Sequence, residues 1–192
     1  MHLPSRLACL PLSLLALALA SCASGTSSRA FVGADFNVVD SLETTVAIDG
    51  LGEGTGDSEY DAIRASVGVV NTDGEGPTSR FGLVAGPVEF NDAEALEVGL
   101  GGYWYVPTGS ASLRPFVGAQ ILGTLYDEDD FGDIGEELSG VPTAGLEYAL
   151  TEHLSVVGAA EYRIPLKAAD GVDGTEVETD GFNVRLGVVF VF

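Results

Sequence analysis

Residues 182–192 read FNVRLGVVFVF, and apolar and polar side chains alternate along them. Phe182, Leu186 and Phe192 fall on one face, whereas Asn183 and Arg185 fall on the other. Successive side chains of a β-strand point to opposite faces, so this stretch predicts a strand with one apolar and one polar face. The apolar face requires either a protein core or a lipid environment.

The same period of two recurs along the chain, interrupted by clusters of Gly, Asp, Asn and Pro. No segment after residue 30 keeps a helical period, and none is apolar over the roughly 18 residues of a membrane-spanning helix. Most of the expected strands have about the 9 to 11 residues, or slightly more, with which a tilted strand crosses a membrane. The eight expected strands are residues 36–49, 59–70, 79–90, 94–106, 112–126, 140–150, 154–167 and 181–192.

The connections between these strands sort by length. A transmembrane barrel has long loops on one side and tight turns on the side of both termini, whereas a soluble barrel has no reason to sort its loops. Of the four odd-numbered connections, the first, fifth and seventh are long and acidic, whereas the third connection of the chain, residues 91–93, is short. The long connections are residues 50–58, 127–139 and 168–180, and the even-numbered ones are residues 71–78, 107–111 and 151–153.

The composition excludes several classes of protein. The chain has 192 residues, which is typical of one domain, and its 8 basic and 29 acidic residues give a net charge of −21. A nucleic-acid binder needs a basic footprint, so that function is excluded. The mean hydropathy is nevertheless +0.27, because the acids are segregated from the apolar stretches. The two cysteines, Cys9 and Cys22, both lie near the N-terminus, so neither a disulfide framework nor a cysteine metal site is expected.

The N-terminal segment predicts export. Arg6 precedes an almost unbroken apolar run over residues 8–20, which is too short to span a bilayer. The run ends in Leu19-Ala20-Ser21-Cys22, which resembles the lipobox of bacterial lipoproteins, so Cys22 is the candidate lipid anchor. Ordinary cleavage after Ala18-Leu19-Ala20 is the alternative. The expected organisation is a signal peptide over residues 1–21, a tether over residues 22–35 and a barrel over residues 36–192.

Several short motifs follow one another in the second half of the chain. Residues 113–119 read LRPFVGA, residues 144–148 read AGLEY, residues 161–163 read EYR and residues 186–192 read LGVVFVF. Their order resembles the outer-membrane β-barrel domain shared by OmpA-, OmpX- and OmpW-like proteins. The resemblance implies an all-β, eight-stranded antiparallel up-and-down transmembrane barrel in the bacterial outer membrane. It also implies that the terminal Phe192 belongs to a signal read by the barrel assembly machinery.

Polar side chains on the inner face of this barrel form the main candidate site. Eight strands enclose a space just wide enough to be filled by side chains, so charges there must pair or meet trapped water. We expect a structural salt-bridge network, the alternative being a narrow gated path for protons or ions. The seven residues of this lumen polar network are Arg64, Glu97, Gln120, Glu147, Glu161, Arg163 and Arg185.

Two loop segments have compositions that could indicate ligand binding. The acidic run over residues 127–130, with Asp133, Glu136 and Glu137, could ligate calcium, but it matches no EF-hand spacing, and acid-rich loops are usually solvated. Residues 50–56 are glycine-rich, but the acids around them repel phosphate, so we expect an extracellular loop. No cofactor is expected.

The interpretation we favour is an outer-membrane barrel with a structural or interaction role, or a narrow gated path, rather than catalysis. Its expected partners are outer-membrane lipid, the assembly machinery and divalent cations at the acidic loops. One alternative is a lipid-anchored soluble lipocalin-like barrel that binds an apolar ligand and turns its charges to solvent. Another is a lipid-modifying outer-membrane enzyme that uses His153 and Ser155, although no acid is placed to complete that pair.

Overall fold

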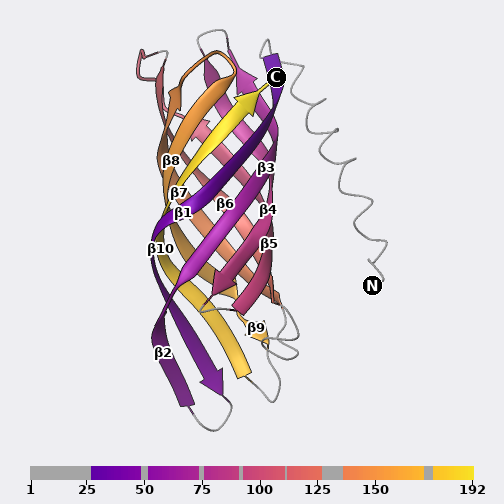
Figure 1. Ribbon diagram of the computed structural model, residues 1–192, viewed down its shortest axis with the longest axis vertical. Coiled ribbons are helices and arrows are strands. Elements are labelled where there is room, and N and C mark those ends of the chain that lie inside the picture. The colour runs from indigo at the N-terminus through magenta and orange to yellow at the C-terminus, as the bar shows by residue number, and fades with distance from the viewer. Residues whose placement is uncertain are drawn as a thin grey trace, which may run out of the picture.

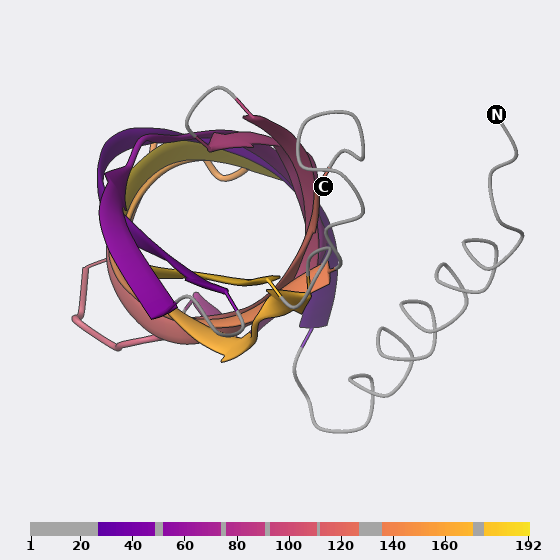
Figure 2. The ribbon, with the colours of Figure 1, turned by 90° about the horizontal axis from the view of Figure 1, so that it is seen from below.

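The computed structural model describes residues 27–48, 52–73, 76–90, 93–110, 112–126, 136–170 and 175–192. These residues form a closed barrel of antiparallel strands, seen from the side in Figure 1 and along its axis in Figure 2. The predicted signal peptide, Cys22 and the acidic run 127–130 lie outside the described residues. None of the described residues forms a helix long and apolar enough to cross a membrane.

Eight long strands form the wall, and two short strands extend it. The wall strands are β1 (Ser27–Ile48), β3 (Tyr60–Thr72), β4 (Pro77–Phe90), β5 (Ala93–Tyr105), β6 (Leu113–Tyr126), β7 (Glu136–Ala149), β8 (Leu154–Lys167) and β10 (Thr175–Val191). The short strands are β2 (Gly52–Ser58) and β9 (Ala169–Asp170). Each wall strand pairs with the next wall strand in the chain, and β10 pairs with β1 to close the ring. The predicted eight-stranded antiparallel up-and-down barrel is therefore confirmed.

The two ends of the barrel differ in their connections. The described chain begins and ends at the same end of the barrel, at the top of Figure 1, which we call the terminal end. Strands there are joined by the short connections 73–76, 106–112 and 150–153. At the opposite, distal end, β1, β2 and β10 run on past the rest of the wall as a protruding sheet (Figure 1). We call this the distal sheet: Leu42–Ile48 of β1, all of β2, and residues 175–181 of β10.

The structure corrects several predicted boundaries. Residues 27–35, which the sequence assigned to the tether, belong to β1 and pair with β3 and β10. Most of the two predicted loops 50–58 and 168–180 is strand, because β2 pairs with β1 and β10 already starts at Thr175. These segments lack an apolar period, since a strand that does not face lipid needs no apolar face. Backbone pairing alone makes them strands.

The outer wall is apolar. Ile63, Leu100 and Leu186 point outward and remain 66%, 61% and 41% exposed, and they belong to a belt of exposed large hydrophobic side chains around the barrel. In the last strand, Asn183 and Arg185 are buried on the opposite, inner face. A contiguous apolar outer surface with a polar interior is the pattern of a barrel surrounded by lipid.

The distal sheet joins the wall at a break in one strand. Ser58 ends β2 and Tyr60 begins β3, while β1, which pairs with both, carries a register shift between Asn37 and Val39. Two side chains of β1 bond the backbone at the break. Asn37 Nδ2 donates to the Tyr60 carbonyl at 2.8 Å, and the Tyr60 amide donates to Asp40 Oδ2 at 2.6 Å. The break therefore leaves the Tyr60 backbone groups satisfied.

Candidate functional site

The barrel interior holds all seven residues that the sequence assigned to it. Alternation along the strands turns each of these side chains inward, and each is at most 3% exposed. The seven are Arg64 on β3, Glu97 on β5, Gln120 on β6, Glu147 on β7, Glu161 and Arg163 on β8, and Arg185 on β10.

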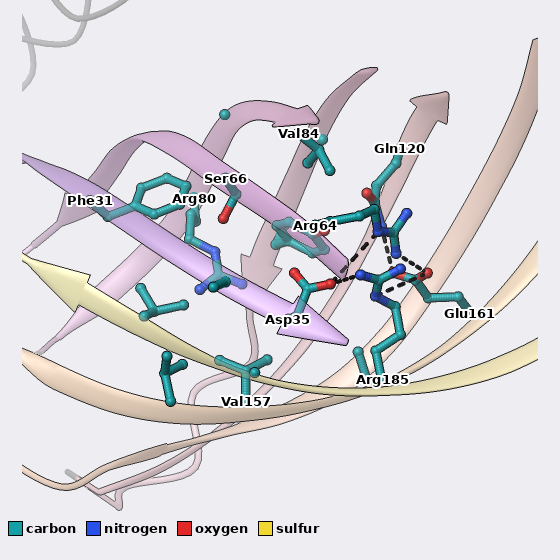
Figure 3. A pocket seen from close by; sticks show the side chains of 18 of the residues that line it. Phe31, Asp35, Arg64, Ser66, Arg80, Val84, Gln120, Val157, Glu161 and Arg185 are labelled. Atoms are coloured by element: carbon teal, nitrogen blue, oxygen red, sulfur yellow. Dashed lines mark hydrogen bonds and ion pairs between the residues drawn. The ribbon is translucent and has the colours of Figure 1, made fainter. Parts of the chain in front are cut away.

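Arg64 lies at the centre of this network. Its Nη2 is 2.6 Å from Glu161 Oε2, its Nη1 is 3.5 Å from Glu97 Oε2, and its Nε is 3.7 Å from Asp35 Oδ1. Gln120 Nε2 donates to the second oxygen of Glu161 at 2.6 Å. Figure 3 shows Asp35, Arg64, Gln120 and Glu161 converging from different walls of the barrel. One guanidinium thus joins β3 to β1, β5 and β8 across the lumen.

Two more arginines complete the central cluster. Arg163 forms an ion pair with Glu97, which also accepts a hydrogen bond from Tyr60 Oη at 3.0 Å. Arg185 forms an ion pair with Asp35. The sequence analysis did not find Asp35 because it lies in the segment that was assigned to the tether. A strand assignment for that segment would have placed Asp35 on the same inner face as Phe31.

A second cluster lies nearer the terminal end. Glu147 accepts from Tyr105 Oη at 2.6 Å and lies 3.3 Å from Arg80 Nη1 and 3.1 Å from Arg114 Nη1. The Arg80 guanidinium also lies over the ring of Tyr103, 4.9 Å from its centroid. Arg80 and Arg114 were missed, although the alternation that placed Gln120 inward on β6 also places Arg114 there.

The charges inside the described barrel nearly balance. Five arginines (Arg64, Arg80, Arg114, Arg163 and Arg185) share the interior with six carboxyl groups (Asp35, Asp40, Glu97, Glu137, Glu147 and Glu161). Asp40 faces inward opposite Asn183 and accepts the Tyr60 amide. Glu137 differs from the carboxyl groups that pair with arginine, because its bonds are to hydroxyl groups. Tyr126 Oη donates to it at 2.8 Å and Ser139 Oγ at 2.9 Å.

The remaining space beside the central cluster is small. A cavity of about 50 Å³ lies between Arg64, Arg80, Gln120 and the seam of β1 and β10 (Figure 3). It has room for a few water molecules at most. Arg64 Nε and Arg185 Nη1 are buried without a hydrogen-bond partner and belong to residues that line this cavity, so ordered water is expected there.

The distal sheet carries the second group of charges. Its register places Asp57, Glu43 and Asp180 side by side across β2, β1 and β10. The next rows on the same outward face bring Glu178 and Glu176 beside Thr45 and Ala47 of β1, and Glu53 lies on the other side of Ala47. We call this surface the acid face. It consists of Glu43, Glu53, Asp57, Glu176, Glu178 and Asp180.

Basic residues are scarce at this end. Seven basic residues lie in the part of the chain that the structure describes, and five of them point into the barrel. Arg29 lies at the terminal end, where its Nε donates to the Phe192 carbonyl at 2.8 Å. Lys167 therefore remains as the basic residue at the distal end. Carboxylates side by side on adjacent strands repel one another, so the acid face is an electrostatic cost that the fold retains.

These features agree with comparison to known proteins. The outer membrane protein beta-barrel domain family matches residues 8–190. The chain belongs to this family. It is therefore an integral barrel of the bacterial outer membrane, and the soluble alternative fails because the charges that it needs on the surface lie inside.

Solved barrels of this kind share the fold at low identity. Neisserial surface protein A (NspA) is 16% identical with a TM-score of 0.52, and the alignment covers 88% of this chain and all of that one. The N-terminal barrel of OprF from Pseudomonas aeruginosa is 15% identical with a TM-score of 0.51, covering 86% and 100%. OprG from the same organism is 15% identical with a TM-score of 0.50, covering 88% and 96%. A search of curated proteins finds no match.

His153 and Ser155 of this outer-membrane barrel have separate environments. His153 Nδ1 lies 2.8 Å from the Val191 carbonyl and 2.9 Å from Arg29 Nη2, and its Nε2 lies 3.4 Å from Glu152. Ser155 is buried in the wall, and none of these contacts of His153 reaches it. Within the described residues, no group of three or more His, Cys, Asp or Glu is placed to hold a metal.

Proposed function

We propose that this protein is a closed, non-catalytic outer-membrane barrel that presents the acid face outside the cell as a surface for cationic partners. Outer-membrane barrels place both termini and their short turns in the periplasm. The terminal end would then face the periplasm and the distal sheet the exterior. The observation that carries the proposal is the contrast between a lumen filled with ion-paired side chains and a protruding sheet with six carboxylates on one face.

The filled lumen supports a barrel that does not conduct. Opening a path would separate Arg64 from Glu161 and Glu97, and removing a buried charge from its partner costs several kcal/mol, on the order of 3 to 5. The small cavity beside Arg64 has room for water without such a separation. The interior ions therefore act as a plug that holds the strands together.

The acid face supports an interaction role. A cation placed between Asp57, Glu43 and Asp180 would relieve the repulsion in that row. Divalent ions and basic segments of other molecules both supply this charge. Because the described residues contain no preformed metal cluster, we propose diffuse binding of divalent cations here rather than chelation.

Two further parts of the proposal concern assembly. We propose that Phe192 is part of the signal read by the barrel assembly machinery. Its side chain is 62% exposed, while its backbone is fixed by a hydrogen bond from its amide to the Ala30 carbonyl at 2.9 Å. We also propose that Cys22 carries a lipid, which would tether the chain a few residues before β1.

Planar bilayers test the closed lumen. The purified protein should give no discrete conductance steps at a high salt concentration of roughly 1 M KCl. Reproducible unitary steps that change when Arg64 is replaced would contradict the plug and favour the gated path instead.

Binding of an oligolysine peptide tests the acid face. Protein in zwitterionic nanodiscs should bind the peptide in a salt-dependent manner, and the double variant Glu43→Gln with Asp57→Asn should bind it more weakly. The matched control neutralises two acids at the terminal end, Asp73→Asn with Glu152→Gln, and should bind like the parent. Equal binding by all three proteins would refute the assignment of the surface.

A further inference from the structure

The open edge of β2 suggests what kind of partner the distal sheet takes. One edge of β2 pairs with β1 from Leu42 opposite Ser58 to Ile48 opposite Gly52. The other edge pairs with no strand in the part of the chain that the structure describes, since β2 is the last strand of the sheet on that side. Alternate residues of such a strand direct their amide and carbonyl groups to solvent.

The short connection between β4 and β5 explains why the edge is open. In the wall, β3 is flanked by β4, and their pairing ends with Tyr60 opposite Phe90. β5 begins at Ala93, so only two residues separate it from the end of β4. No strand of the described chain therefore continues beside β2 where it projects past the wall, on the left of Figure 1.

The edge also lacks three of the features that commonly block strand addition: a lysine, a proline and a bulge. Residues 52–58 read GEGTGDS, without the lysine or proline that commonly protects an exposed edge. Pairing with β1 continues along all of β2 without a bulge. A Cβ built on Gly54 or Gly56 meets nothing within 4 Å, so the space above these two residues is open. A neighbouring strand would find room there for bulky side chains.

Charge selects the occupant. Glu53 and Asp57 lie four residues apart and share the outward face of β2. In a second copy added antiparallel about Thr55, Glu53 of each chain would face Asp57 of the other, which is a repulsive arrangement. Basic side chains at those two positions would instead be attracted.

We propose that β2 accepts an extended peptide as an additional antiparallel strand. The peptide carries basic residues four apart, opposite Glu53 and Asp57, and apolar residues between them that fill the open space over Gly54 and Gly56. Backbone hydrogen bonds then supply affinity and alternate side chains supply specificity. The inference rests on the proposed role of the acid face and adds the class of partner and its backbone conformation.

The probe that tests it is the peptide Thr-Lys-Val-Thr-Val-Lys-Thr, with the full protein in zwitterionic nanodiscs. Bound peptide should slow amide hydrogen exchange in residues 52–58 by about tenfold or more, because edge amides become bonded. A peptide with the same side chains, but with N-methyl groups on the residues whose amides face β2, should bind about tenfold more weakly. Equal binding by both peptides would overturn strand addition and leave the electrostatic role of the acid face standing.

Charge reversal supplies the matched control. The variant Glu53→Lys with Asp57→Lys should lose the lysine peptide and gain the glutamate peptide Thr-Glu-Val-Thr-Val-Glu-Thr, because only the facing charges change. Failure of this exchange would refute the register.

Two outcomes separate this inference from the proposed function. If oligolysine binds the acid face but the strand peptide leaves exchange in β2 unchanged, the inference fails alone. If oligolysine does not bind either, the proposed function fails, and the inference fails with it. Dimers that protect β2 without any peptide would show that a second copy is the occupant and would overturn the choice of a basic peptide.

Discussion

The barrel interior and the acid face both contain several carboxylates, but those inside are mostly buried beside arginines, whereas those on the acid face are mostly exposed and repel one another. Inside, Glu97, Glu147 and Glu161 are buried and pair with arginines, so removing one partner leaves a buried charge unpaired. On the acid face, Glu43 lies between Asp57 and Asp180, and water screens their repulsion. The same residue type is therefore structural in one region and available for recognition in the other.

The largest effect should come from breaking the interior network at its centre. Replacing Arg64 by Met leaves Glu161 and Glu97 with one cation fewer, which should lower the free energy of unfolding by about 3 to 5 kcal/mol. Urea unfolding in lipid vesicles measures this loss. Adding Glu161→Gln should recover part of it, because the unpaired charge is removed. A loss below about 1 kcal/mol, or no recovery, would mean that the ions do not stabilise the barrel.

The next largest effect separates the lipid-facing wall from the distal sheet within one strand. Leu186 and Glu178 both point outward from β10, but Leu186 lies on the apolar wall and Glu178 on the acid face. Leu186→Arg should cost about 2 to 4 kcal/mol near the bilayer midplane. The control Glu178→Arg should cost nothing, because its position is solvated. Similar losses of unfolding free energy in the two variants would show that the membrane boundary does not lie between Leu186 and Glu178.

A smaller effect is expected at Glu137, an interior carboxyl group whose hydrogen-bond partners include no arginine. Gln at position 137 can keep bonds to Tyr126 and Ser139, so Glu137→Gln should change the unfolding free energy by at most about 1 kcal/mol. The same change at Glu97 leaves Arg163 without its carboxylate and should cost far more. Equal losses of unfolding free energy in the two variants would show that pairing with arginine does not distinguish Glu97 from Glu137.

The smallest effect, and the one of opposite sign, belongs to the acid face. Glu43→Lys should raise the unfolding free energy by about 0.2 to 1 kcal/mol, since the new cation lies between Asp57 and Asp180. The gain should fade at high salt, and Glu43→Gln should show only the part that comes from lost repulsion. Destabilisation by Glu43→Lys at low salt would argue that the row is already neutralised by a bound ion.

Sequence reasoning succeeded where lipid contact imposes a period. The apolar face of residues 182–192 fixed the register of the last strand, and parity along the other strands placed all seven predicted side chains inside. It failed where strands do not face lipid. GEGTGDS alternates glycine with polar residues but has no apolar face, and its pairing with β1 makes it a strand. Asp35 was missed because the tether was extended to residue 35, over the first part of β1.

The seam between β1 and β10 has a consequence for how the barrel forms. Its pairing runs from Phe31 opposite Val191 to Ile48 opposite Thr175, the longest register between two described strands, and it joins the two ends of the sequence. Pairing β1 with β10 closes a loop that contains all the other strands, and such long loops close slowly because the entropy cost is high. The seam can form only after the last strand has reached the membrane. The β1–β10 seam is thus the last pairing to form, and it has the most strand pairing to break when the barrel opens. Once sealed, the barrel should persist through a high barrier to reopening rather than through equilibrium stability alone.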